Sequence, residues 1–176
     1  MNRRLLAAAV CLVLLAAAPA LAASKPKGFT PKKLAGTWSG TWSNQTFNTT
    51  GTLMLQEKPV RKGKAFQFIV DLGGNELGCP DPAPEGTPVI TKGSGNNHWN
   101  KKGFKLHLIS PAYGTFSVSY SHKTHKLTGG GADPSCAPGV SWQLDGSLTK
   151  ASFTGTIGIK LAGGQTASSS LTANRQ

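Results

Sequence analysis

The stretch "GTWSGTWSN", residues 36 to 44, has the clearest β-strand pattern in the chain. It places Trp38, Gly40 and Trp42 on one side of an extended chain, and threonine and serine side chains on the other. Strict alternation of this kind, rich in tryptophan and threonine, is typical of a β-strand with one buried face. We therefore expect this stretch to be the first strand of an antiparallel sheet.

The same alternation recurs between short turns along the chain as far as Leu161, whereas helical periodicity is nearly absent beyond the first 23 residues. This pattern predicts an all-β chain of eight or nine short antiparallel strands, because even spacing between turns is typical of sandwiches and barrels. The alternating segments are 36–43, 52–57, 64–72, 100–109, 114–120, 140–148 and 153–161, with shorter ones near 89–90 and 127.

Five glycines lie inside these predicted strands, at Gly40, Gly114, Gly146, Gly155 and Gly158. Glycine weakens a strand and is commonly found where a sheet bends or coils sharply, as the closure of a barrel requires. The glycines therefore favour a single antiparallel up-and-down barrel. A two-sheet β-sandwich remains the alternative.

The first strand resembles two related barrel families. Gly36-Thr37-Trp38 is similar to the Gly-x-Trp signature that opens lipocalins, and this resemblance implies that Trp38 closes one end of the barrel as a structural plug. "GTWSNQ", residues 40 to 45, resembles the first strand of the avidins, which implies that Asn44 and Ser43 contact a ligand. Together they suggest a lipocalin-like, or calycin, architecture.

The chain also departs from the lipocalin pattern. No Thr-Asp-Tyr segment follows downstream, no helix is expected after the barrel, and the strand that we expect to be the last, which ends at Leu161, carries no partner arginine. The resemblance is therefore confined to about ten residues.

Polar and aromatic residues around the first interstrand loop are the candidate ligand site. Because strands alternate in direction, the loop after Trp42 lies at the opposite end of the barrel from Trp38. Aromatic side chains with a few polar neighbours at a barrel mouth can hold an apolar molecule, although the same aromatics can equally be core. The candidate ligand-binding residues are Trp42, Ser43, Asn44, Gln45, Phe47 and Trp142.

Residues 1–23 have the pattern of a cleavable signal peptide. Arg3 and Arg4 precede an apolar run over residues 5–18, and the small residues Ala20-Leu21-Ala22 form a cleavage signature. We therefore expect a secreted or periplasmic protein, with no second apolar run that is long enough to span a bilayer.

The remaining chain is long enough for one domain. We expect an N-terminal segment over residues 24–33, the β-barrel over 34–162 and a flexible C-terminal tail over 163–176, because the tail is small and polar in composition.

Cys79 and Cys136 are the two cysteines that follow the leader, and both lie in loops rich in glycine, proline and aspartate. In an oxidising compartment an isolated pair is most simply a disulfide. Four predicted strands separate the two loops, which places them at the same end of the barrel. No metal site is expected, because two cysteines without a nearby histidine provide too few ligands.

The chain is strongly basic. Its formal net charge is +12, and it becomes +10 when Arg3 and Arg4 leave with the leader. Acidic polysaccharide and lipid headgroups are possible partners of such a surface. Nucleic acid is not expected, because the lysines are scattered and no recognition helix is present.

No nucleophile motif, phosphate-binding loop or paired carboxylates stand out, so we expect no catalytic residue and no cofactor. The sequence thus favours a secreted non-enzymatic protein that holds a small hydrophobic or amphipathic ligand in its barrel. The alternative is a basic surface protein that binds acidic glycans or lipid headgroups and has no internal ligand. Nothing in the sequence fixes the oligomeric state.

Overall fold

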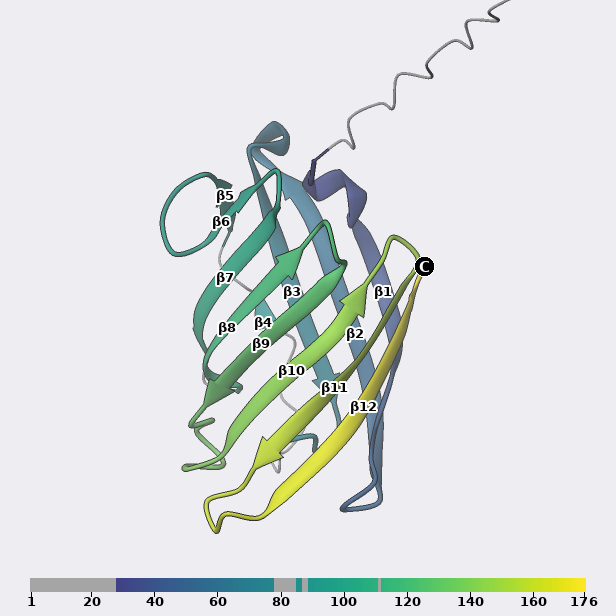
Figure 1. The fold of residues 1–176 in the computed structure, drawn as a ribbon, viewed down its shortest axis with the longest axis vertical. Coiled ribbons are helices and arrows are strands. Elements are labelled where there is room, and N and C mark those ends of the chain that lie inside the picture. The colour runs from purple at the N-terminus through teal and green to yellow at the C-terminus, as the bar shows by residue number, and fades with distance from the viewer. Residues whose placement is uncertain (1–27, 78–84, 87–88, 111) are drawn as a thin grey trace, which may run out of the picture.

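The computed structural model describes residues 28–77, 85–86, 89–110 and 112–176 as one closed β-barrel (Figure 1). The first strand, β1 (Gly36–Asn44), pairs with β2 (Thr49–Val60) on one side and with β12 (Thr166–Arg175) on the other. Because β2 also pairs with β3 (Ala65–Gly73), the sheet closes on itself. The prediction of an all-β barrel is confirmed, and the sandwich alternative is wrong.

Eleven strands of the described chain complete the ring, rather than eight or nine. Strand β5 (Ile90–Lys92) overlaps the short strand expected near 89–90, and it pairs in parallel with β6 (His98–Asn100), which follows a segment rich in glycine and asparagine and was not expected. The two-residue strand β4 pairs with β3 alone. The remaining strands are β4 (Glu85–Gly86), β5 (Ile90–Lys92), β6 (His98–Asn100), β7 (Gly103–Ser110), β8 (Gly114–Ser121), β9 (Lys126–Ala132), β10 (Ser141–Leu148) and β11 (Ser152–Lys160).

The predicted flexible tail is wrong, because residues 166–175 form β12, which pairs with β1 and β11. Ala167, Ser169, Leu171 and Ala173 face the interior, and the residues between them are exposed. All of these inward side chains except Leu171 are small. A strand of this composition does not have the hydrophobic contrast that identifies a buried face from sequence.

The barrel has two ends, which we name as Figure 1 shows them. The upper end carries the start of β1, the β2–β3, β8–β9 and β10–β11 turns and the end of β12. The lower end carries the β1–β2, β9–β10 and β11–β12 loops and the end of β3. Two short 3-10 helices, η1 (Pro31–Lys33) and η2 (Arg61–Gly63), both belong to the upper end.

Aromatic side chains fill the upper half of the barrel. Phe29, 2% exposed, lies 5.5 to 6.3 Å between ring centres from each of its aromatic neighbours. Residues from the predicted N-terminal segment therefore help to close the barrel, and this role was not foreseen. We call the following set the aromatic cluster: Phe29, Phe66, Trp99, Phe104 and Tyr120.

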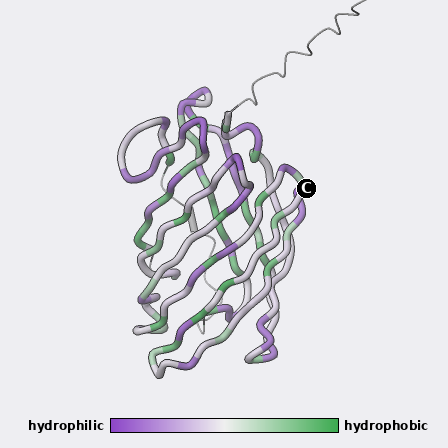
Figure 2. The backbone as a smooth tube through the Cα atoms, in the orientation of Figure 1, coloured by the Kyte–Doolittle hydropathy of each residue, from purple (hydrophilic) through white to green (hydrophobic). Residues whose placement is uncertain are grey.

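Hydrophobic and hydrophilic residues alternate along the strands, and the turns at the upper end are hydrophilic (Figure 2). Residues 1–23 and Cys79 lie outside the described residues, so the leader and the disulfide with Cys136 stay predictions. In the described part of the chain, no helix has the length and apolar character needed to cross a membrane.

Candidate functional site

An internal cavity of about 70 Å³ lies inside the barrel below the aromatic cluster. All of the side chains that line it are apolar or aromatic, so the cavity offers almost nothing but hydrophobic contact. They are Leu53, Leu55, Phe68, Val70, Leu72, Leu77, Tyr113, Phe116, Val118, Leu127, Trp142, Leu144, Phe153, Ile157 and Leu171.

Trp142 is the one predicted ligand-binding residue that lines this cavity. Its indole Nε1 donates a hydrogen bond of 3.2 Å to the carbonyl oxygen of Tyr113, and its ring lies 5.7 Å from that of Phe116. The hydrogen bond and the contact with Phe116 restrain the indole ring where it lines the cavity. Trp142 is therefore a rigid part of the cavity wall.

Trp42 does not line the cavity. It is 1% exposed, and its Nε1 donates a hydrogen bond of 2.8 Å to the carbonyl oxygen of Gly73. A Cβ atom added to Gly51 would lie 2.5 Å from the indole ring, so the tryptophan packs directly on backbone. Its role in the structure is to tie β1 to the end of β3.

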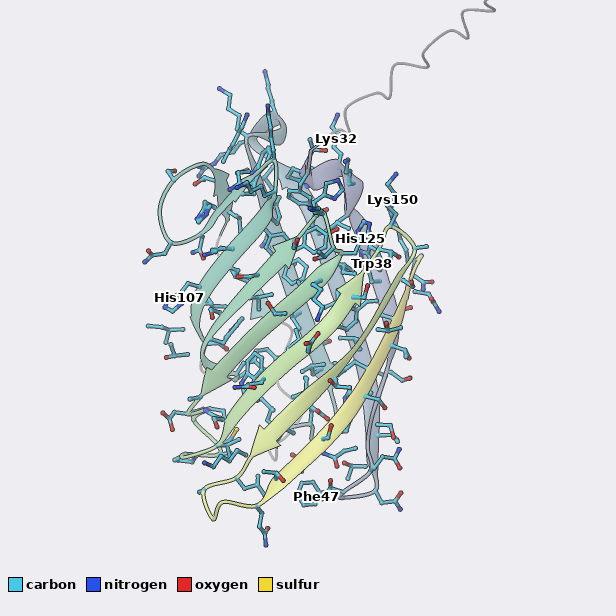
Figure 3. All side chains as sticks on the ribbon, in the orientation of Figure 1. Lys32, Trp38, Phe47, His107, His125 and Lys150 are labelled. Carbon is cyan, nitrogen blue, oxygen red and sulfur yellow. The ribbon has the colours of Figure 1, made fainter. Side chains whose placement is uncertain are left out.

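The polar residues after Trp42 form the turn between β1 and β2. The Asn44 side-chain oxygen accepts the backbone N–H groups of Thr46 (2.9 Å) and Phe47 (3.1 Å), which is the pattern of an Asx turn. Gln45 Nε2 donates to Ser43 Oγ at 3.3 Å. Phe47 is 50% exposed at the tip of the lower end (Figure 3). None of these residues lines the cavity.

Trp38 lies at the upper end, 2% exposed, with its Nε1 donating to the carbonyl oxygen of Leu34 at 3.3 Å. The guanidinium of Arg175 lies 5.9 Å from the centre of the Trp38 ring. Sequence analysis found no such arginine because it ended the barrel at Leu161. The last strand is β12, and Arg175 is its final residue.

Glu76 and Ser169 are buried polar residues that sequence analysis missed. Glu76 is 5% exposed and Ser169 is 1% exposed, and Ser169 faces the interior from β12. Neither the carboxyl oxygens of Glu76 nor the Ser169 hydroxyl makes a hydrogen bond of normal geometry within the described residues. Burial raises the pKa of Glu76 to about 7, and the neighbouring Ser169 hydroxyl reduces this rise.

Glu76 and Ser169 are close in sequence to residues that line the lower part of the cavity. Leu77, next to Glu76, and Leu171, two residues from Ser169 on the same face of β12, both line it. Buried polar groups are normally hydrogen-bonded, and the poorly aligned contact between Glu76 and Ser169 leaves hydrogen-bonding capacity unused on both. A bound molecule with a polar end would satisfy them.

Glu57 is a second buried carboxyl group. It is 3% exposed on β2, and neither of its oxygens has a hydrogen-bond partner within the described residues. Burial raises the pKa of Glu57 to about 8, although the positive charge of Arg175 acts in the opposite direction. Glu57 is therefore mostly uncharged at neutral pH. It does not line the cavity.

The described histidine, cysteine and acidic side chains form no group of three that could hold a metal ion. His122 and His125, in the β8–β9 turn, lie 5.9 Å apart between ring centres. His122 Nε2 is 2.9 Å from Lys33 Nζ, and His125 Nδ1 is 3.3 Å from the Tyr120 hydroxyl. These contacts hold the turn against η1 and the aromatic cluster.

Comparison with known proteins identifies a related fold only. No family model matches the chain, and no curated protein matches it. A crystal structure of a protein of unknown function from the DUF3598 family of Nostoc punctiforme superposes with a TM-score of 0.54, at 10% sequence identity and over 88% of this chain. The match covers 53% of that protein, so the chain spans about half of its length.

A second solved structure, a conserved protein of unknown function with a hot dog fold from Alicyclobacillus acidocaldarius, has 10% identity, with 83% of this chain and 81% of that chain covered. Its TM-score of 0.20 carries no argument. The comparisons therefore support the barrel and leave the function to be argued from the site.

The glycine and asparagine residues around Glu76, in "GGNELG", predict a loop and gave no sign that one side chain turns inward. Phe29 also gave no signal, because it lies before the first alternating segment. The features that define the site are therefore set by tertiary packing.

Proposed function

We propose that this chain is a secreted, non-enzymatic binding protein that holds a slender molecule with an apolar body and one hydrogen-bonding end inside its barrel. The observation that carries the proposal is the apolar cavity together with the unsatisfied Glu76 carboxyl and Ser169 hydroxyl beside it. An apolar body would occupy the cavity, and the polar end would satisfy the two buried groups.

The size of the cavity limits the ligand. Pockets for drug-sized molecules have volumes of about 300 to 1,000 Å³, and the cavity of about 70 Å³ is well below that range. A narrow alkyl chain fits such a space better than a ring system. A bulky polycyclic ligand would require the wall residues to move.

The polar end of the ligand is restricted by Glu76. Because the pKa of Glu76 is raised to about 7, its carboxyl group is present in both forms near neutral pH. The neutral form can donate a hydrogen bond and the ionised form can only accept. An alcohol satisfies both forms and an amine favours the ionised one, whereas a carboxylate would place two negative charges together.

The lipocalin-like resemblance supports this proposal. Gly36-Thr37-Trp38 begins β1, and Arg175 at the end of β12 covers the Trp38 ring, as the first-strand signature and its partner arginine would do in that family. We propose on these grounds that the barrel is calycin-like.

Titration with linear alcohols tests the proposal. Calorimetry with 1-butanol to 1-octanol should show an affinity that rises about fourfold for each added methylene, since each buried CH₂ contributes about 0.8 kcal/mol. The rise should stop when the chain fills the cavity. Mass spectrometry of the natively purified protein should also show whether a molecule of this class is retained.

A cavity-filling variant and a matched exterior variant complete the test. Val118→Phe adds volume to the cavity wall and should abolish alcohol binding, whereas Ile109→Phe changes a side chain that is 77% exposed and should bind as the wild type does. The proposal is wrong if the wild type gives no heat with any alcohol and retains no molecule, or if Val118→Phe binds normally.

A further inference from the structure

The basic residues gather at the upper end of the barrel, although they are scattered along the sequence. Of the fifteen lysines and arginines between residues 28 and 176, only Lys160 lies at the lower end, and Lys105 and Lys126 extend from β7 and β9 close to the upper rim. The other twelve lie at the upper end, where Figure 3 shows Lys32 and Lys150. We call the following set the basic end: Lys32, Lys33, Lys58, Arg61, Lys62, Lys64, Lys92, Lys101, Lys102, Lys123, Lys150 and Arg175. All of them are exposed except Lys33, which is half-buried.

Backbone hydrogen bonds join the turns that carry these residues. The N–H of Lys92 bonds to the carbonyl oxygen of Lys64. The N–H of His122, next to Lys123, bonds to the carbonyl oxygen of Lys102. The basic end is therefore a continuous surface held by the rim of the barrel.

The η1 segment and the C-terminus belong to the same surface. Phe29 N–H bonds to the carbonyl oxygen of Lys101, which fixes the N-terminal segment across the rim. Arg175 Nη1 bonds to the carbonyl oxygen of Lys150 at 3.4 Å. Charges from both ends of the described chain thus lie on one face of the molecule.

Few negative charges oppose this surface among the acidic side chains that the structure describes. Glu57 is buried beneath it, and its raised pKa leaves it mostly neutral. Asp145 forms an ion pair with Lys126 at 3.5 Å. Asp71, Glu76 and Asp133 belong to the lower half of the barrel. The charge distribution is therefore strongly polarised along the barrel axis.

We infer that the basic end is a docking surface for a membrane rich in anionic phospholipid headgroups. Basic side chains near such a surface are attracted by its negative potential, and the attraction accumulates over many residues. The two features that favour a lipid surface over a linear polyanion are the shape of the end and its composition.

The basic end spreads over a whole rim and borders the shallow depression that contains Lys102, Lys105 and Lys126. A broad cap fits a planar surface, whereas recognition of a nucleic acid uses a helix, strand or arm that enters a groove. Lysine outnumbers arginine at this end, and lysine acts as a point charge without the fork that matches single phosphates. The basic end is therefore suited to a surface whose negative charge is spread over many headgroups, rather than to a single phosphate group.

Gly28, the first residue that the structure describes, packs against Lys101 of the basic end. A membrane held by this end would leave the lower end, with Glu76 nearby, facing solvent.

Vesicle co-sedimentation tests the inference. The protein should bind vesicles that contain phosphatidylglycerol and should not bind vesicles of phosphatidylcholine alone. Raising the salt concentration from about 0.05 M to about 1 M should release it, because the screening length falls to about 3 Å.

Paired charge variants locate the docking surface. Lys62→Gln/Lys123→Gln removes two charges from opposite turns of the basic end, and Lys160→Glu makes the same change in net charge at the lower end. Each lysine near the membrane is worth about fivefold in partitioning, so the first variant should bind on the order of 25-fold more weakly. The second variant has the same net charge and should change much less.

Three results would overturn the inference. The first is equal weakening in both variants, which would show that net charge alone matters. The second is an absence of binding to anionic vesicles at low salt. The third is binding to duplex DNA or to a soluble acidic polysaccharide that depends on Lys62 and Lys123 while vesicles are ignored.

Discussion

The guanidinium of Arg175 covers the Trp38 indole at 5.9 Å, and the two residues are paired across β1 and β12 where the barrel closes. The same arginine donates to the carbonyl oxygens of Ala35 and Lys150. Its charge also offsets part of the rise that burial causes in the pKa of Glu57. One side chain at the C-terminus therefore joins the first strand, the last strand and the upper rim.

Replacement of Arg175 should weaken this closure. Arg175→Ala removes an exposed cation–π contact and two side-chain hydrogen bonds, and it should lower the free energy of unfolding by about 1 to 2 kcal/mol. Urea unfolding measures the change. Arg175→Lys keeps the charge but not the planar fork, so it should restore only part of the loss. Unchanged stability in Arg175→Ala would show that the closure does not depend on this residue.

Truncation of Phe29 should destabilise the barrel far more. Phe29 is 2% exposed within the aromatic cluster, and Phe29→Ala should cost about 3 to 5 kcal/mol through lost packing and the cavity that remains. Phe47→Ala is the matched control, because Phe47 is 50% exposed and its loss should change stability by less than about 0.5 kcal/mol. Thermal unfolding of both variants compares them directly. Similar values for the two would contradict the role of Phe29 in closing the upper half of the barrel.

The fold could be predicted from sequence where one face of a strand is large and apolar. On β1, Trp38 and Trp42 face inward and the serine and threonine residues between them are on the other face, as the alternation predicted. The same signal was absent from β12, where Ala167, Ser169 and Ala173 face inward and are no larger than their outward neighbours. Periodicity detects contrast between faces, so a strand of small residues is invisible to it.

The candidate site was harder to predict because adjacency in sequence does not determine which groups share an interior. Trp42 and Asn44 are both buried, yet their polar atoms are used by Gly73 and by the turn at Thr46. Glu76 is drawn inward from a loop, beside Ser169 on a strand that was taken to be a tail. Glu76 and Ser169 come together only when the barrel closes, so no local sequence pattern can predict the pair.

Alanine substitutions should distinguish glycines at which barrel closure leaves no space for a side chain from glycines at which a side chain fits. A Cβ atom at Gly40 would lie 1.8 Å from the carbonyl oxygen of Thr172 on β12, so Gly40→Ala should force the two strands apart and cost several kcal/mol. Gly158 has no atom within 4 Å of the same position, and Gly158→Ala should be neutral or stabilising by about 0.4 to 1 kcal/mol. Chemical denaturation of each variant measures the effect. Equal tolerance at both positions would contradict the close approach of β1 and β12.

Stability should decrease as the pH rises, because Glu57 and Glu76 have raised pKa values in the folded protein. Burial places these values at about 8 and about 7, against 4.5 for an unperturbed glutamate. Between pH 4.5 and the folded value, the folded protein holds a proton that the unfolded chain has released. Each group therefore removes up to about 1.4 kcal/mol of stability for each pH unit in its window.

Glu57→Gln isolates one of the two contributions. The amide does not titrate, so the variant should lose stability less steeply than the wild type between pH 5 and pH 8. The slope that remains comes from Glu76 and should level off above its pKa of about 7 in the folded protein. Urea midpoints at half-unit pH intervals give both slopes. Glu76→Gln is the reciprocal variant, and its loss of stability should continue to about pH 8. If the Glu57→Gln and wild-type curves are parallel, Glu57 is ionised in the folded protein and the upper half of the barrel must provide a counter-charge for it.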